Sequence, residues 1–74
     1  MSKLIRLDRT GHTTLAEWTA DDDAALARAT AAFASELERG MIASVAVGGG
    51  AAEVVRELPA EAELVLLRRP IAGG

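Results

Sequence analysis

The sequence contains no cysteine, one histidine and one lysine among its 74 residues. Without cysteine the chain has no disulfide framework, no thiolate nucleophile and no cysteine-ligated zinc site. The histidine, His12, follows a glycine and has no serine or cysteine nearby in the sequence, which favours a surface turn residue over a catalytic base. We therefore expect neither an enzyme nor a metal-binding protein.

Aromatic residues and positive charge are also scarce. Trp18 and Phe33 are the only aromatic residues, and the formal net charge is −3, so no nucleic-acid partner is expected. No apolar run approaches the roughly 18 residues of a membrane-spanning helix, and charges interrupt the N-terminal residues where a signal peptide would be apolar. Arginine outnumbers lysine seven to one, which suggests a GC-rich bacterial genome. We expect a cytoplasmic bacterial protein that does not bind membranes.

One helix is expected between Thr19 and Gly40, in an alanine-rich stretch of high helix propensity. Thr19 is predicted to cap this helix, with Asp22 three residues on as the acidic member of a capping box. Gly40 is predicted to end it in the left-handed conformation. The three acids at 21–23 point in different directions on a helix, so they favour a helix start over a metal site.

Large apolar side chains are few for a chain that is half hydrophobic. Of the hydrophobic residues 16 are alanine and only 21 are larger. A chain of this length buries about 60% of its unfolded surface, which allows one small core and little room for an active-site cavity. Leu26, Phe33 and Leu37 are predicted to form the buried stripe of the helix. Trp18 is expected in the core, with a partner-binding patch as the alternative.

Strands are expected near both ends of the chain. Residues 3–9 and 13–18 favour a hairpin that turns at Gly11. Residues 64–69 contain an unbroken apolar run, which predicts a central strand buried on both faces. If this strand lies beside the first, their connection is a long crossover containing the helix, and the two strands are parallel. The sequence thus predicts an α+β fold: a mixed sheet of four to five strands with one helix packed across one face.

A second hairpin is expected after the helix. Residues 41–47 alternate as a half-buried strand should. Gly48-Gly49-Gly50 is predicted to turn the chain into a second arm over residues 51–58, for which a short helical turn is the alternative. No Gly-Lys-Ser/Thr sequence follows these glycines, so a phosphate-binding loop is not expected.

The last residues of the sequence are expected to react only through their terminal carboxylate, because they carry no reactive side chain. Pro70 cannot donate to a strand ladder, so pairing is expected to stop there, and Gly73 and Gly74 come last. We expect a folded domain over residues 1–69 and a flexible tail over residues 70–74 that ends in a Gly-Gly carboxylate.

In this order of elements and in three motifs the chain resembles the ubiquitin-like β-grasp superfamily, which includes ubiquitin and the bacterial sulfur carriers of molybdopterin and thiamine synthesis. Thr10-Gly11-His12-Thr13-Thr14 is similar to the Thr-Gly turn of ubiquitin's first hairpin. Leu64-Val65-Leu66-Leu67-Arg68 resembles its last strand, and Gly73-Gly74 its terminus. Pro70-Ile71-Ala72-Gly73-Gly74 is similar to the Pro-Val-x-Gly-Gly ending of the molybdopterin-synthase small subunit. The element order matches over nearly the whole chain.

The resemblance implies that the protein is a substrate of enzymes rather than an enzyme. An activating enzyme of the ubiquitin type would use ATP to adenylate the Gly74 carboxylate, and Gly73 would provide clearance in the narrow channel that leads to the nucleotide. No cofactor would be bound by the chain itself. The tail residues expected to dock onto partners are Arg68, Arg69, Pro70, Ile71 and Ala72.

Three functions follow as alternatives. The favoured one is a bacterial ubiquitin-like modifier that is conjugated to target proteins, with a conjugating enzyme and a deconjugating peptidase as further partners. Lys3, the single lysine, is then the one side-chain acceptor for chain linkage. The second is a sulfur carrier that bears a Gly74 thiocarboxylate for cofactor synthesis. The third is a β-grasp module that binds partners without covalent chemistry.

Overall fold

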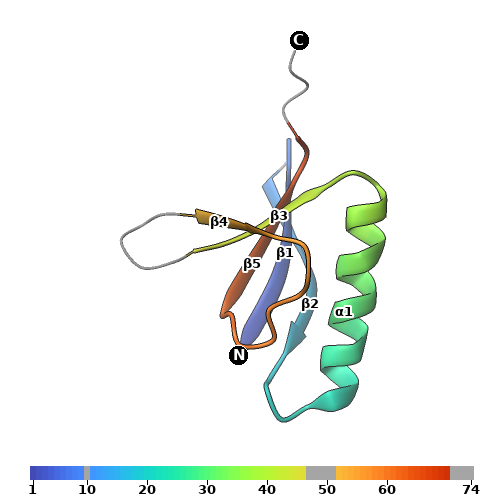
Figure 1. Ribbon diagram of the computed structural model, residues 1–74, viewed down its shortest axis with the longest axis vertical. Helices are drawn as coiled ribbons and strands as arrows, with labels where there is room; N and C mark the ends of the chain where they lie inside the picture. Colours follow the sequence, from blue (N-terminus) through green and yellow to red (C-terminus); the bar gives the residue numbers. More distant parts are fainter. Residues whose placement is uncertain (10, 47–51, 71–74) are drawn as a thin grey trace.

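The computed structural model describes residues 1–9, 11–46 and 52–70. One helix packs on a mixed five-stranded sheet (Figure 1). The predicted α+β class is confirmed at this level, with five strands. The elements in chain order are β1 (Ser2–Asp8), β2 (Gly11–Trp18), α1 (Asp23–Glu38), β3 (Ile42–Ala46), β4 (Ala52–Val55) and β5 (Leu64–Arg68).

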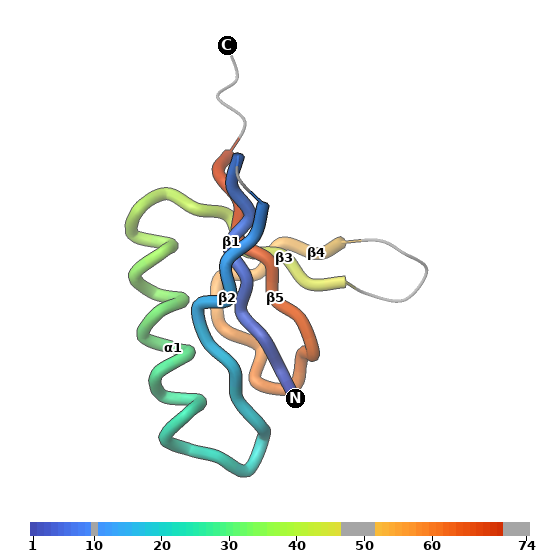
Figure 2. The backbone as a smooth tube through the Cα atoms, turned by 180° about the vertical axis from the view of Figure 1, so that it is seen from behind, coloured from blue at the N-terminus to red at the C-terminus, as the bar shows by residue number. Residues whose placement is uncertain are grey.

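The first and last strands lie side by side in the centre of the sheet. The strand order is β2-β1-β5-β3-β4. Strands β1 and β5 run parallel, with Leu4 opposite Val65, whereas the other neighbours are antiparallel. Because the central pair is parallel, the carboxyl ends of β1 and β5 lie at the same end of the sheet (Figure 2). The predicted central and parallel position of the last strand is confirmed.

The start of α1 differs from the prediction. Asp22 is the N-cap, and its carboxylate accepts a hydrogen bond from the Ala25 N–H at 3.0 Å. The Thr19 hydroxyl instead donates to the Asp21 carboxylate at 2.9 Å, within the turn that precedes the helix. The prediction of Thr19 as the cap is therefore wrong. Aspartate is as suitable an N-cap as threonine, and Asp22 directly precedes the first helical residue, Asp23, so Asp22 takes the cap position.

The end of α1 agrees with the prediction. Gly40 has a φ of +89°, in the left-handed region that favours glycine. Its N–H donates to the Leu37 carbonyl at 2.9 Å, and the Met41 N–H donates to the Glu36 carbonyl at 3.1 Å. This pair of bonds is a Schellman motif, which satisfies two carbonyls that the helix leaves free.

The core lies between α1 and one face of the sheet. Trp18 and Phe33 are both buried, as predicted, and the indole Nε1 of Trp18 donates to the Ala60 carbonyl at 3.0 Å. Full burial of each large apolar side chain contributes about 1.5–3 kcal/mol. The buried apolar residues are Leu4, Trp18, Ala25, Ala29, Phe33, Ala43, Val65 and Leu67.

The helix face that meets the sheet is centred on small residues. Ala25 and Ala29 are buried together with Phe33, whereas Leu26 and Leu37 pack at the margin of the core and are only partly buried. Alanine lets the helix axis approach the sheet closely, so the leucines on either side splay around the contact. The predicted stripe is thus confirmed for Phe33, whereas the two leucines pack against the core without being fully buried.

Strand β5 is central but is not buried on both faces. Val65 and Leu67 are fully buried beneath α1, whereas Leu64 is 40% exposed and Leu66 is partly exposed. The helix covers one face of the sheet (Figures 1 and 2). Because side chains alternate along a strand, Leu64 and Leu66 belong to the face opposite to that of Val65 and Leu67. The prediction of burial on both faces is wrong because it assumed a second covering layer.

Both predicted hairpins are present. Gly11 starts β2 opposite Asp8 and has a φ of +127°, so the turn needs glycine there. Strands β3 and β4 pair antiparallel, and β4 occupies only the first part of the arm predicted for residues 51–58. The predicted glycine turn at 48–50 lies outside the described residues.

Candidate functional site

The candidate site is the end of the sheet where β5 finishes. Since β1 is parallel to β5 and β3 is antiparallel to it, the end of β1, the end of β5 and the entry to β3 meet there. Arg6 lies opposite Leu67, and Ile42 lies opposite Arg68. The Schellman turn after α1 delivers the chain to the same end. Residues far apart in sequence thus surround the point where the chain leaves the sheet (Figure 2).

A groove opens at this end of the molecule, and we call it the arginine groove. Three arginines from different elements, Arg6, Arg39 and Arg69, line it together with one buried carboxylate, Glu36. The lining comes from residues 6–8 of β1, from residues 36 and 39–41 around the end of α1, and from residues 69–70 after β5. A neighbouring hollow is lined by residues 7–9 and 69.

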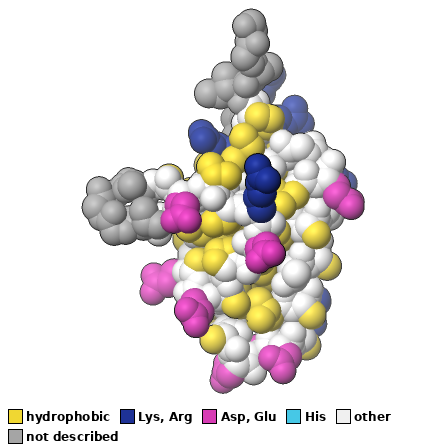
Figure 3. All heavy atoms as spheres, in the orientation of Figure 1, with side chains coloured by type: hydrophobic (Ala, Val, Ile, Leu, Met, Phe, Trp, Pro, Cys, Tyr) yellow, Lys and Arg dark blue, Asp and Glu magenta, His cyan; other side chains and the backbone are white. Residues whose placement is uncertain are grey.

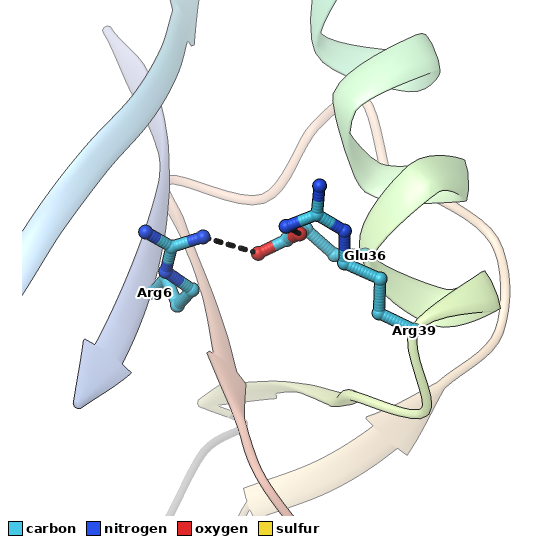
Figure 4. Close-up of polar contacts among 3 residues, drawn as sticks. All are labelled: Arg6, Glu36 and Arg39. Carbon is cyan, nitrogen blue, oxygen red and sulfur yellow. Dashed lines mark hydrogen bonds and ion pairs between the residues drawn. The ribbon is translucent and has the colours of Figure 1, made fainter.

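Glu36 pairs with two of these arginines. Arg6 Nη1 donates to Glu36 Oε1 at 3.1 Å, and Arg39 Nη1 lies 3.7 Å from Glu36 Oε2. The Glu36 side chain is 6% exposed, whereas those of Arg6 and Arg39 are 33% and 69% exposed. Figure 4 shows the guanidinium groups reaching the carboxylate from β1 and from the end of α1. A hydrogen bond to a buried carboxylate thus holds Arg6 at the groove, and Arg39 lies within ion-pair distance of the same carboxylate.

The chemistry of the groove is anion binding. Guanidinium groups present several fixed N–H donors in a plane that fits carboxylates, and Glu36 uses only part of that capacity. Figure 3 shows, on the face in view, Lys and Arg side chains mostly towards the end of the molecule where β5 finishes, with Asp and Glu side chains mostly over the other half. On this face the positive side chains therefore gather near the end of β5.

Of the predicted tail residues, the structure describes the first three. Arg68, Arg69 and Pro70 are exposed at the end of β5, which is the accessibility that docking requires. Arg69 and Pro70 also line the arginine groove. The remaining predicted residues, Ile71, Ala72, Gly73 and Gly74, lie outside the described residues. The division into a domain over 1–69 and a flexible tail over 70–74 stays a prediction.

The predicted acceptor, Lys3, lies far from this site. It is exposed near the start of β1, opposite Leu64 at the start of β5, whereas Arg68 is at the end of β5. Four residues of strand separate the two positions, which corresponds to about 13 Å at 3.3 Å per residue. The structure does not bring Lys3 and the tail residues together.

The structure gives no chemical role to two other residues that the sequence analysis considered. His12 is exposed on β2, as predicted, and Asp22 caps α1. Within the described residues, no group of three or more His, Cys, Asp or Glu side chains is placed to hold a metal ion. Over the same ranges, no helix combines the length and apolar character needed to cross a bilayer.

Sequence reasoning missed the Arg6–Glu36–Arg39 cluster, although a signal was present. Arg6 is two residues after the buried Leu4, so strand alternation places it on the helix-facing side of β1. Glu36 is three residues after the buried Phe33, which places it on the sheet-facing side of α1. Two inward positions with opposite charge predict an ion pair once β1 and α1 are known to pack together.

No protein-family model, curated protein or solved structure matches the chain.

Proposed function

We propose that the chain is a bacterial ubiquitin-like modifier with a β-grasp fold. Its Gly74 carboxylate attacks the α-phosphorus of ATP on an activating enzyme, and pyrophosphate leaves. A thiol or amine then attacks the acyl carbon of the adenylate, AMP leaves, and an amine of the target protein finally holds Gly74 in an isopeptide bond. The chain contributes a stable domain and an accessible carboxylate, and the enzymes contribute the catalytic groups.

One observation carries the proposal: the central strand β5 ends at the exposed Arg68 and is followed by the exposed Arg69 and Pro70, and Pro70 is four residues before Gly74. For activation, the Gly74 carboxylate has to enter the active site of the enzyme while the domain that ends with β5 stays folded. Four residues span at most about 14 Å, which is enough to enter a narrow channel. The glycines lack side chains that would clash there.

The sheet supports the β-grasp part of the proposal. A parallel central pair, β1 and β5, with one helix across one face is the arrangement of that fold, and the strand order β2-β1-β5-β3-β4 agrees with it. Strand β4 at one edge is short, and β2 at the other carries exposed polar residues, which discourages edge-to-edge association. A protein that has to be handed between enzymes benefits from remaining monomeric.

A sulfur carrier is the second candidate, because Pro70-Ile71-Ala72-Gly73-Gly74 is similar to the ending of the molybdopterin-synthase small subunit. Both candidates share the adenylation step. They differ in the nucleophile: sulfur yields a thiocarboxylate at Gly74, whereas a target amine yields an isopeptide bond.

Intact mass spectrometry of the protein isolated from its native host tests the proposal. Gly74 joined to lysines of other proteins supports the modifier, and replacement of one terminal oxygen by sulfur supports the carrier. The matched control is a variant that lacks Gly73 and Gly74, which keeps the domain and removes the reacting group. Absence of both products, together with no ATP–pyrophosphate exchange by any adenylating enzyme of the native host, would overturn both. Partner binding that survives the deletion would instead indicate a non-covalent module.

A further inference from the structure

The strongest feature outside the tail itself is the uneven distribution of charge. Five arginines lie at the end where β5 finishes, namely Arg6, Arg9, Arg39, Arg68 and Arg69. Two acidic side chains, Asp8 and Glu36, lie beside them, so these seven side chains have a formal charge of +3. The remaining side chains have a formal charge of −6, which gives the net charge of −3. An acidic protein with a basic end presents that end to negatively charged partners and repels them elsewhere.

We propose that the arginine groove binds an acidic peptide segment of the activating enzyme, beside the entrance through which the tail reaches the nucleotide. The identity of the partner rests on the proposed function, whereas the chemistry of the groove rests on the structure. The segment bridges Arg39 of the helix end and Arg69 of the β5 end, and Arg6 lines the groove between them.

Glu36 makes the groove suited to several carboxylates spaced along a peptide rather than to a single small anion such as phosphate. Both of its oxygens lie between Arg6 and Arg39, at 3.1 Å and 3.7 Å from their Nη1 atoms. A phosphate placed between these guanidinium groups would meet the Glu36 carboxylate, so a single dianion is repelled from the middle of the site. The outward N–H groups of the exposed arginines stay free to receive carboxylates spaced along an extended chain.

The same carboxylate reduces the cost of binding at Arg6. Long arginine side chains lose rotamer freedom when they are immobilised at an interface, which weakens association. Glu36 is 6% exposed and already holds Arg6 through a hydrogen bond of 3.1 Å, whereas Arg39 is 69% exposed and lies 3.7 Å from the carboxylate. A partner therefore meets one guanidinium group, that of Arg6, whose position is set in advance. Nucleic acid is disfavoured as the occupant, because a long polyanion would also lie along the acidic remainder of the surface.

The groove also fixes where the partner's acidic segment lies relative to its nucleotide. Pro70 lines the groove and is four residues from Gly74, so the reacting carboxylate is within about 14 Å of the groove's edge. The acidic segment must then flank the entrance of the channel that leads to ATP. This placement distinguishes the groove from a general electrostatic attraction, which would require no particular site.

Binding of a short capped peptide of alternating aspartate and glutamate, followed by two-dimensional NMR, tests the groove directly. We expect shifts at the Gly40 and Arg69 amides and at the Arg6 and Arg39 Nε–H groups. Arg39→Glu should weaken binding about tenfold or more, whereas Arg28→Glu, the same charge change on an exposed helix position outside the groove, should change it little. Arg39→Gln is the second variant, since it places no carboxylate beside Glu36 if Arg39→Glu folds poorly.

Two comparisons decide between the possible occupants. A capped peptide of alternating asparagine and glutamine should not bind, and inorganic phosphate should bind weakly and without preference for the groove. The proposal is overturned if phosphate reproduces the shifts at similar concentration, if Arg28→Glu weakens the acidic peptide as much as Arg39→Glu, or if the peptide shifts no groove residue.

Kinetics with the adenylating enzyme separate this inference from the proposed function. We expect Arg39→Gln to raise the KM for this chain about fivefold or more with kcat unchanged, because it removes a binding contact away from the reacting carboxylate. If the natural protein is adenylated and Arg39→Gln shows the same KM, the groove inference fails and the proposed function stands. If the natural protein is never adenylated, the proposed function fails and the peptide experiment still decides what the groove binds.

Discussion

Arg6 on β1 and Glu36 on α1 form an ion pair of 3.1 Å between residues that are 30 positions apart in the sequence. The pair joins the central strand to the last turn of the helix, at the end of the sheet where β5 also finishes. The Glu36 side chain is almost fully buried, and its two oxygens lie 3.1 Å from Arg6 Nη1 and 3.7 Å from Arg39 Nη1. The same carboxylate therefore contributes to folding and positions the arginine groove.

We expect Glu36→Gln to lower the free energy of unfolding by about 1–2 kcal/mol, since the amide keeps the shape but loses the charge-assisted bonds. Solvent at the one-third exposed Arg6 screens part of the attraction, which keeps the loss moderate. Urea unfolding followed by circular dichroism measures it. Glu38→Gln, at an exposed position two residues on, is the control and should change stability little. Equal stability of the two variants would contradict the role given to Glu36.

Asp22→Ala should destabilise the protein by about 1 kcal/mol, because the Ala25 N–H loses its acceptor at the helix start. Thr19→Ala removes only an exposed hydroxyl contact with Asp21 and should cost less than about half as much. Thermal unfolding of the two variants, compared side by side, shows which residue caps α1. A larger loss for Thr19→Ala would reverse the assignment.

Gly40→Ala should cost about 1 kcal/mol for a reason that does not involve packing. A Cβ at this position would meet no atom within 4 Å, but the φ of +89° strains any residue that carries one. Gly40→Asn should cost less, since asparagine tolerates this conformation better than alanine does. Chemical denaturation of the three proteins gives the order glycine, asparagine, alanine. Equal stabilities would mean that the Schellman turn does not constrain the chain.

Trp18→Phe should lower the stability by about 2–3 kcal/mol, through lost volume in the core and an Ala60 carbonyl left without its indole donor. Val54→Ala, at a side chain that is 61% exposed, should change it by less than about 0.5 kcal/mol. In the natural protein, acrylamide should quench the fluorescence of Trp18 far less before unfolding than after it. Strong quenching of the folded protein would place the indole at the surface.

Under the proposed function, Gly73→Val should reduce kcat/KM for ATP-dependent activation about 100-fold, because a branched side chain in a narrow channel would displace the Gly74 carboxylate. Gly73→Ala should have a smaller effect, so the two variants form a graded series. Neither should alter the thermal unfolding temperature, since position 73 follows the end of the last strand. ATP–pyrophosphate exchange measures the first effect and circular dichroism the second. Full activity of Gly73→Val would remove the clearance argument.

The central position of β5 could be predicted because the connection between β1 and β5 is long and contains the helix. The end of α1 at Gly40 was equally predictable, since few residues take that conformation. The start of α1 was not, because three consecutive acids and Thr19 offer competing caps, and only the helix rotation that buries Ala25 and Phe33 selects Asp22. The partial exposure of the β5 face that α1 does not cover could not be predicted either. An apolar run shows that a strand can be buried, but not how many layers cover it.

The sequence by itself determined the α+β class and the parallel central pair, because alternation, helix propensity and connection length are local or depend on chain order alone. It also pointed to Arg68, Arg69 and Pro70 as accessible residues at the end of the last strand. Only the tertiary structure decided that Arg6, Glu36, Arg39 and Arg69 line one groove. Their proximity depends on how α1 is rotated against the sheet and on the meeting of the ends of β1, α1 and β5. Such contacts arise between distant segments, so no spacing along the chain records them.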